Sequence, residues 1–386
     1  MARKTILIAH PFLSAVGGGN AVATWAIQAL IRDYDVAVAT LGPIDTPALN
    51  RAFGTSLAPK DFQVAIAPRK YLRRLSFVPT RGALLESHLT IAWARELDRR
   101  NRYDVLFSTQ NEADFGRPGL QYIHYPGWYL PRPAHELQWF HRIPGLLALY
   151  RRYCFRISHA TQQGIEANIS LANSTFVAGR TRDAHRCEPV ILYPPVPGNF
   201  PDVPWEQRRP AIVGIGRLDP LKRWGMAVEI VDAVRARGHE MALTLIGQPD
   251  SRDEERRLWR MAESRPWLRI LTNLSREELA GEVASHRYGV HAMIDEHFGI
   301  APAELQRAGC VTFVHRSGGP VEIVGHDPRL TFDSVADAAE KIVRAIEDPE
   351  TGGELRALVA SRRDCFSSDR FCRELRLQVA AFTARS

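Results

Sequence analysis

Cysteines are few and long apolar runs are missing, and each scarcity excludes a class of protein. The 386-residue chain has five cysteines, an odd number, and none of them forms a Cys-x-x-Cys pair. This pattern argues against a disulfide framework and a structural zinc site, so we expect reduced thiols in a cytoplasmic protein. No stretch approaches the ~20 apolar residues that a membrane-spanning helix needs. The short apolar run at residues 6–9 ends at His10-Pro11, which favours a first β-strand over a secretion signal.

The common nucleotide-binding and nucleic-acid-binding motifs are also missing. The chain has no Gly-x-Gly-x-x-Gly fingerprint, no P-loop, and no helix-turn-helix, zinc-finger or RNA-recognition signature. We therefore expect no nucleic-acid partner, although the sequence pI is ≈ 9.3. The excess positive charge lies in the first half: residues 1–200 hold 23 Lys and Arg against 14 Asp and Glu, whereas residues 201–386 hold 27 against 29. Such a basic half suits phosphates or anionic lipid head groups.

Suitable metal-ligand spacing is scarce as well. Asp33-Tyr-Asp35 has Asp-x-Asp spacing, but it enters a predicted strand from its amino end. Ligands of open parallel sheets bind at the carboxyl ends of the strands, which lie on the other side. No other cluster of acids or histidines has a spacing typical of a metal site. We predict that the protein requires no metal ion and no cofactor.

Two series of alternating strands and helices run along the chain. In the first, an apolar run at 4–9, a glycine cluster, a helical pattern from Asn20 and a strand pattern at 35–40 predict a βαβ unit. Five prolines within residues 193–204 then block helix and central strand, and the alternation restarts at Ala211. We expect an α/β fold of two Rossmann-like domains facing a cleft. The expected parts are an N-terminal domain at 1–192, a linker at 193–204, a C-terminal domain at 205–366 and a C-terminal helix at 367–386 that crosses back to the N-terminal domain.

Two loops that follow predicted strands carry residues suited to phosphate. The glycines at 17–19 open a helix, where close backbone approach and free N–H groups favour an anion. In the sequence Gly-Arg-Leu-Asp-Pro-Leu-Lys-Arg at 216–223, Arg217 can pair with phosphate oxygens and Lys222 adds a point charge. Two such cations would stabilise a diphosphate as a leaving group.

Two carboxylates stand eight residues apart in the sequence Glu-His-Phe-Gly-Ile-Ala-Pro-Ala-Glu at 296–304. A carboxylate accepts two hydrogen bonds and so suits a vicinal diol. One of the two could hold the ribose of a nucleotide, and the other could hold a sugar attached to it. A glycosidase acid/base pair would also use two carboxylates, but it leaves the cations Arg217 and Lys222 without a role. His124, at the end of a predicted strand, is a further polar candidate.

The order of these motifs along the chain resembles that of a known family. The Glu-x7-Glu pair, the loop 216–223, the Ser-Gly-Gly-Pro at 317–320 and the glycines at 17–19 are similar to those of retaining family 4 glycosyltransferases of the GT-B fold. Within this family, the segments HPFLSAVGGG, IHYPG, LYPPV, HFGIAPAE and SGGPVEIV look most like the α-1,2-mannosyltransferases of dolichol-linked oligosaccharide assembly. The chain departs from those enzymes at Asn20-Ala21, where they carry charged residues.

The resemblance implies an activity and a role for each matching residue. The enzyme would move a hexose, with mannose from GDP-mannose as the first expectation, to a hydroxyl of a glycan or lipid-linked glycan, with retention of configuration and without a metal. Glu304 would hold the ribose, Glu296 the donor sugar, and His124 would lie near the anomeric carbon. The implied catalytic residues are His124, Glu296, Arg217 and Lys222, and the implied donor-binding residues are Gly17, Gly18, Gly19, Arg217, Lys222, Glu296, Phe298, Gly299, Ile300 and Glu304.

The acceptor side gives a weaker pattern and leaves alternatives open. Residues 69–156 hold 15 Lys and Arg against 7 Asp and Glu, and the basic-aromatic segments 68–77 and 137–153 are typical of a protein that docks on anionic lipid. A basic surface over buried aromatics would give the same pattern. The alternative activities are an inverting GT-B transferase and a sugar-nucleotide 2-epimerase, which the product anomer and turnover without acceptor would distinguish.

Overall fold

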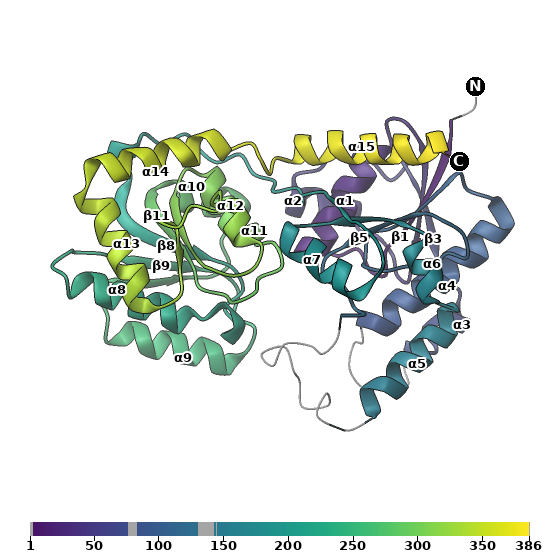
Figure 1. Cartoon of the computed structure of the whole chain (residues 1–386), viewed down its shortest axis with the longest axis horizontal. Coiled ribbons are helices and arrows are strands. Elements are labelled where there is room, and N and C mark those ends of the chain that lie inside the picture. Colours follow the sequence, from purple (N-terminus) through teal and green to yellow (C-terminus); the bar gives the residue numbers. More distant parts are fainter. Residues whose placement is uncertain (1–2, 76–82, 130–142, 144, 386) are drawn as a thin grey trace. The chain divides into compact units, whose positions relative to one another are not determined.

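The computed structural model describes residues 3–75, 83–129, 143 and 145–385 (Figure 1). The chain divides into two compact units. Unit 1 comprises Met1–Pro195 and Ser368–Ser386, and unit 2 comprises Val196–Ser367. The division therefore lies inside the proline-rich segment. Residues from Val196 onward belong to unit 2, where the Val196 N–H donates to the Phe366 carbonyl oxygen at 3.0 Å.

The described part of unit 1 is built on a parallel sheet with the strand order β3-β2-β1-β4-β5-β6-β7. The strands are β1 (Thr5–Ala9), β2 (Asp35–Thr40), β3 (Gln63–Ile66), β4 (Val105–Ser108), β5 (Leu120–Ile123), β6 (Ile169–Ala172) and β7 (Val190–Ile191). The helices are α1 (Gly18–Leu30), α2 (Thr46–Phe53), α3 (Arg69–Leu72), α4 (Ala83–Asn101), α5 (Leu146–Ser158), α6 (Gln162–Glu166), α7 (Thr175–Ala184) and α15 (Ser368–Arg385). The expected parallel α/β arrangement is confirmed.

Strand β1 shows why these strands read as continuous apolar runs. Successive side chains of a strand point to opposite faces of the sheet. Ile6 and Ile8 enter the core beneath α1, α2 and α15, whereas Leu7 enters the core beneath α3, α4 and α5. All three side chains are fully buried. A strand covered on both faces needs apolar residues at every position, as parallel sheets usually do.

The described part of unit 2 repeats this plan with the strand order β10-β9-β8-β11-β12-β13. The strands are β8 (Arg209–Ile215), β9 (Leu243–Ile246), β10 (Leu268–Leu271), β11 (His286–His291), β12 (Val311–His315) and β13 (Thr331–Phe332). The helices are α8 (Trp224–Arg235), α9 (Arg252–Glu263), α10 (Arg276–Ala284), α11 (Ile300–Arg307), α12 (Pro320–Ile323), α13 (Val335–Glu347) and α14 (Pro349–Arg362), with short 3-10 turns at Trp205–Gln207 (η4) and Pro220–Lys222 (η5).

In each sheet the chain adds strands first toward one edge and then toward the other. The change occurs between β1 and β4 in unit 1 and between β8 and β11 in unit 2. Loops that leave the carboxyl ends of such strands diverge, and ligands of open α/β sheets bind there. The loops after β8 and β11 contain the segments 216–223 and 292–299. The fold thus places Arg217, Lys222 and Glu296 in loops that follow adjacent strands.

The last helix, α15, returns to unit 1 and lies beside α1 (Figure 1). Phe371, Leu375, Val379 and Phe382 recur every three or four residues, so they share one helix face and are buried in the unit 1 core. In the part of the chain that the structure describes, no helix has the length and apolar character needed to cross a bilayer.

We predict that the inner face of α15 carries much of the stability of unit 1. Leu375→Ala should lower the free energy of unfolding by ~2–5 kcal/mol, because it leaves a cavity in a closed core. The matched control is Leu377→Ala on the same helix, where the leucine is 67% exposed; its effect should stay within about 0.5 kcal/mol. Urea unfolding of both variants measures this, and equal effects would contradict the packing of α15.

Candidate active site

The loop after β8 is shaped so that Lys222 turns inward. Gly216 has a φ of 144°, which an L-residue rarely adopts. Asp219 then begins the 3-10 turn η5, with its Oδ1 accepting from the Lys222 backbone N–H at 3.2 Å. The buried Trp224 donates its Nε1–H to the Arg217 carbonyl oxygen at 3.0 Å and so fixes the same turn. The Lys222 side chain is consequently only 13% exposed.

The loop after β11 presents Glu296 and is held by the Ser-Gly-Gly-Pro segment at 317–320. Asp295 donates its N–H to Ser317 Oγ at 2.8 Å, and Gly319 donates its N–H to the Glu296 carbonyl oxygen at 2.8 Å. Gly318 has a φ of 77°, and a Cβ placed on it would lie 2.3 Å from the Glu296 carbonyl oxygen. The two glycines therefore permit a close backbone contact that sets the position of Glu296.

Lys222 and Glu296 come together as an ion pair between these two loops. The Lys222 Nζ contacts Glu296 Oε2, and His291 Nε2, at the end of β11, lies 3.3 Å from the same oxygen. Burial alone would raise the pKa of the Glu296 carboxyl, but the Lys222 charge and the His291 ring outweigh it and hold this pKa well below its usual range. Burial, together with the Lys222 charge, lowers the pKa of His291 although Glu296 opposes it, so the imidazole is neutral at pH 7. The site therefore holds one cation, one anion and one neutral donor.

Glu304, the second carboxylate, lies on α11 and is paired with Arg276 of α10. Arg276 Nη2 lies 2.6 Å from Glu304 Oε1 and also donates to the Pro197 carbonyl oxygen at 2.6 Å. The Glu304 side chain is 10% exposed. A ligand hydroxyl that binds Glu304 would thus meet a carboxylate already oriented by an arginine.

The other predicted donor residues surround this region in different ways. Phe298 is buried, with its ring packed edge-on against Phe366 at 5.5 Å between centroids, so its side chain belongs to the core. Gly299, with a φ of 98°, is the N-cap of α11, and Ile300 is its first residue. Arg217 is exposed and contacts Asp219 and Asp250, with nitrogen–oxygen distances of 3.4 and 3.5 Å.

In unit 1 the glycine loop is organised by a buried histidine and an asparagine. His10, which directly follows β1, has its Nε2 2.9 Å from Asn20 Oδ1 and its Nδ1 3.0 Å from Thr109 Oγ1. Asn20 Nδ2 donates to the Val16 carbonyl oxygen at 2.6 Å and to Ser14 Oγ at 2.9 Å. Asn20 thereby closes the loop that leads into Gly17, the N-cap of α1. This helix begins at Gly18, two residues earlier than predicted.

His124 lies next to this glycine loop. Its backbone N–H donates to Asn111 Oδ1 at 2.8 Å, and its Nε2 lies 3.0 Å from the Thr109 carbonyl oxygen. A Cβ on Gly19 would lie 3.5 Å from His124 Nε2, within ordinary van der Waals contact, so the glycine and the imidazole are neighbours. The structure therefore brings the predicted glycines and His124 together within unit 1.

The predicted site residues thus form two groups, one in each unit. The unit 1 group is Gly17, Gly18, Gly19 and His124, and the unit 2 group is Arg217, Lys222, Glu296, Phe298, Gly299, Ile300 and Glu304. The sequence analysis missed His10, His291 and Arg276. The two histidines stand at the carboxyl ends of strands β1 and β11, and this position was a usable signal. Nothing local in the sequence marks Arg276.

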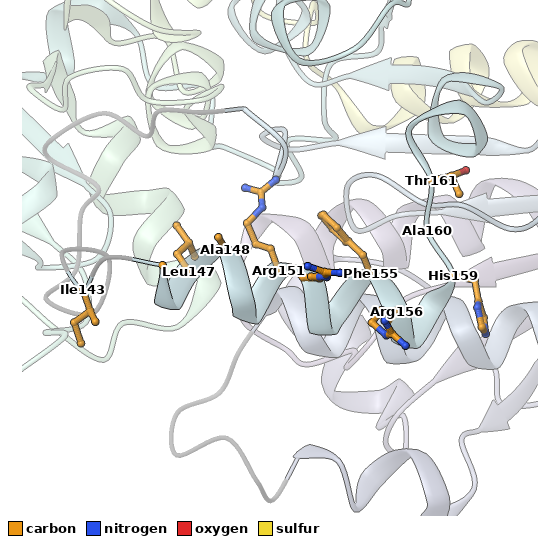
Figure 2. A pocket seen from close by; sticks show the side chains of 11 residues that line it. Ile143, Leu147, Ala148, Arg151, Phe155, Arg156, His159, Ala160 and Thr161 are labelled. Atoms are coloured by element: carbon orange, nitrogen blue, oxygen red, sulfur yellow. The ribbon is translucent and has the colours of Figure 1, made fainter.

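A surface hollow of ≈ 830 Å³ lies along α5 in unit 1 (Figure 2). Its lining includes Leu147, Arg151, Phe155, Arg156 and Thr161. Arg151 also donates to the Gly127 carbonyl oxygen at 2.9 Å, which connects α5 with the loop after β5. Residues 76–77, 137–142 and 144 of the predicted basic-aromatic segments lie outside the described residues.

We predict a pH dependence that originates at His10. Burial lowers the pKa of His10 from 6.5 to about 4. The unfolded chain therefore binds a proton below pH 6.5 that the folded chain does not bind until about pH 4. The stabilising contribution is complete above pH 6.5 and is lost as the pH falls toward 4, by about 2 kcal/mol at pH 5. Urea unfolding of wild type and His10→Gln at pH 7 and pH 5 should show this difference; equal pH dependence in both would contradict it.

The chain is similar in sequence to known glycosyltransferases. The model for glycosyl transferases group 1 matches residues 198–360. The chain is 25% identical over 370 residues to the mouse GDP-Man:Man(3)GlcNAc(2)-PP-Dol alpha-1,2-mannosyltransferase, covering 83% of this chain and 75% of that protein. The protein of the same name from Eremothecium gossypii is 24% identical, covering 81% of this chain and 59% of that protein.

Solved structures show the same fold over nearly the full chain. Anabaena Alr3699/HepE in complex with UDP matches with a TM-score of 0.67 and 13% identity, covering 98% of this chain and all of that one. Sucrose-phosphate synthase from Thermosynechococcus elongatus matches with a TM-score of 0.67 and 14% identity, covering all of both chains. The chain is therefore a glycosyltransferase of the GT-B fold, and its residues 198–360 are similar to glycosyl transferases group 1.

Proposed function

We propose that this glycosyltransferase moves mannose from GDP-mannose to a hydroxyl of a lipid-linked glycan, with retention of configuration and without a metal ion. The observation that carries the proposal is the buried pair of Lys222 and Glu296 at the switch point of the unit 2 sheet. The choice of mannose and of a lipid-linked acceptor is supported by the names of the relatives.

In this proposal, Lys222 binds the diphosphate of the donor. A diphosphate carries more negative charge than one carboxylate, so it would draw the Lys222 ammonium away from Glu296. Arg217, exposed on the same loop, adds a second cation with a planar set of donors. Positive groups aimed at a leaving diphosphate stabilise the charge that develops as the glycosidic bond breaks. A metal ion can supply the same stabilisation, and the proposal assigns it to these two side chains instead.

The two carboxylates would divide the donor between them. Glu296, released from Lys222, would accept hydrogen bonds from hydroxyls of the donor sugar. Glu304 would accept from the ribose diol while Arg276 keeps its charge compensated. The backbone N–H groups around Gly299 and Ile300 begin α11 and would face the same ligand.

The residues of unit 1 keep the roles that the sequence analysis gave them as predictions. Gly17, Gly18 and Gly19 would approach the donor phosphate, and His124 would lie beside the donor sugar. Their support within unit 1 is the network of His10, Asn20 and Thr109, which fixes the loop and the imidazole together.

We predict that nucleotide binding identifies the donor. In a thermal-shift series without added metal, GDP and GDP-mannose should stabilise the protein, whereas UDP, ADP and their sugars should not. A ligand held at 100 times its dissociation constant adds ~2.7 kcal/mol to the stability. A shift with UDP-sugars alone would still support a transferase but would show that GDP-mannose is not the donor. No shift with any nucleotide would contradict the donor site.

We predict different losses from the two carboxylates. Glu304→Gln should weaken GDP binding by ~1.5–3 kcal/mol, since it removes a charged hydrogen-bond acceptor from the ribose. Glu296→Gln should leave GDP affinity at or above the wild-type value, because Lys222 no longer needs to leave a carboxylate, but it should abolish most transfer of the sugar. Titration calorimetry with GDP and an assay of released GDP measure the two effects.

The control for these carboxylate variants is Glu277→Gln, which removes an exposed acid beside Arg276 on α10. It should change neither GDP binding nor transfer. Equal loss of GDP affinity in Glu296→Gln and Glu304→Gln would show that the two carboxylates do not have separate roles.

We further propose that the exposed face of α5 docks on an anionic membrane on its cytoplasmic side. Leu146, Leu149 and Tyr153 are exposed at spacings of three and four residues and share one face of the helix. Arg152 and Arg156 are exposed on the same side. Apolar side chains flanked by arginines suit the boundary between anionic head groups and acyl chains.

This face is tested by sedimentation with vesicles that contain anionic phospholipid at physiological salt. Wild type should sediment, and Leu149→Glu should bind on the order of 10-fold less, because it replaces an exposed apolar side chain that would enter the lipid by a negative charge that the anionic lipid repels. The matched control is Leu377→Glu on α15, since both leucines are 67% exposed on a helix. No sedimentation of wild type, or equal loss in the two variants, would contradict docking through α5.

A further inference from the structure

Glu296 has two buried partners of different kinds. Lys222 reaches it on a long flexible side chain from η5, whereas His291 is the last residue of the central strand β11. The His291 side chain is 1% exposed, and Lys222 and Glu296 are 13% and 16% exposed. The lysine can therefore move, and the histidine cannot leave its place without disturbing the sheet.

Donor binding would deprive Glu296 of its mobile partner. In the proposed function, the diphosphate draws Lys222 away from the carboxylate. A buried carboxylate that loses its cation pays a desolvation cost of several kcal/mol unless another donor satisfies it. It would also lose the contact that fixes its direction, at the moment when it must meet the sugar hydroxyls. Among the described residues, His291 is the other group that pairs with Glu296.

We infer that His291 is a positioning residue that holds the Glu296 carboxylate for the donor sugar once the diphosphate engages Lys222. This inference rests on the proposed function and extends it to a residue that touches neither the sugar nor the phosphate. His291 acts through Glu296 as a neutral donor, with the proton on Nε2. A neutral ring adds no charge that would compete with Lys222 for the diphosphate.

The geometry without a donor supports a contact that tightens on binding. His291 Nε2 lies 3.3 Å from Glu296 Oε2, and within the described ranges it has no well-aligned hydrogen-bond partner. Buried polar atoms are seldom left in this state unless a ligand or a movement completes them. Withdrawal of Lys222 would free Glu296 Oε2 to turn toward the imidazole N–H.

The test compares binding of GDP with binding of GDP-mannose by titration calorimetry, or of the nucleotide pair that gives the thermal shift. His291→Phe keeps the ring shape and removes the donor. With GDP alone the sugar site is empty and water can solvate Glu296, so GDP affinity should change little, whereas GDP-mannose, which excludes this water, should bind about 10- to 100-fold more weakly and kcat should fall. His291→Gln, whose amide N–H can replace Nε2–H, should recover most of this loss. In a Glu296→Gln background the effect of His291→Phe should vanish, since the two residues act through one contact.

His286→Gln is the matched control, because His286 is a buried histidine at the other end of the same strand. It should leave the ratio of GDP-mannose to GDP affinity unchanged. If His291→Phe does not fold, His291→Asn, which is too short to reach Glu296, replaces it.

Three results would contradict the role of His291 or the proposed function, and they can be told apart. Wild-type affinities for both ligands in His291→Phe would overturn the inference and leave the proposed function intact. Equal weakening of GDP and GDP-mannose, without recovery in His291→Gln, would make His291 structural only. Failure of the wild type to bind any nucleotide or nucleotide sugar would overturn the proposed function, and the inference with it.

Discussion

The organisation of the unit 2 site depends on one buried ion pair, that of Lys222 and Glu296. Each side chain is largely withdrawn from water, and each supplies the charge that compensates the other. Removing one partner of such a pair costs far more than the pair contributes, because the remaining charge stays buried. A ligand that needs Lys222 must therefore also change the surroundings of Glu296. With the roles proposed for Lys222 and Glu296, this pair would couple recognition of the diphosphate to recognition of the sugar.

The backbone around the pair leaves little freedom for either partner. Strands β8 and β11 are neighbours, so their loops start side by side. Gly216 and Gly318 adopt positive φ values, and a side chain on Gly318 would collide with the Glu296 backbone. Trp224 fixes the Arg217 carbonyl oxygen through a hydrogen bond from its indole N–H. Glycine at these two positions thus leaves room for the backbone turns that bring Lys222 and Glu296 together. This explains why the glycines and the charged residues occur in the same motifs.

The sequence predicts the elements well and the contacts between them poorly. Strands buried on both faces are continuous apolar runs, so β1 is plain from the sequence, whereas β11 begins with the polar residues His286 and Arg287, which no apolar run marks. The cations and carboxylates were recognised because their chemistry is local. Their pairing was not, since Lys222 and Glu296 are 74 residues apart and meet only through the strand order. Arg276 reaches Glu304 from α10, and nothing in the sequence marks this arginine as the partner of Glu304.

The two units stabilise their loops by opposite means. Unit 2 uses charges, whereas unit 1 uses a neutral relay whose proton positions follow from its partners. Asn20 donates its amide N–H to the Val16 carbonyl oxygen, so its Oδ1 must face His10 and accept. His10 then carries its proton on Nε2, and its bare Nδ1 accepts from the hydroxyl of Thr109. An amide suits this place because it donates and accepts at once: a carboxylate could not donate to the Val16 carbonyl oxygen, and an ammonium could not accept from His10. Asn20 therefore suits the neutral buried histidine beside it.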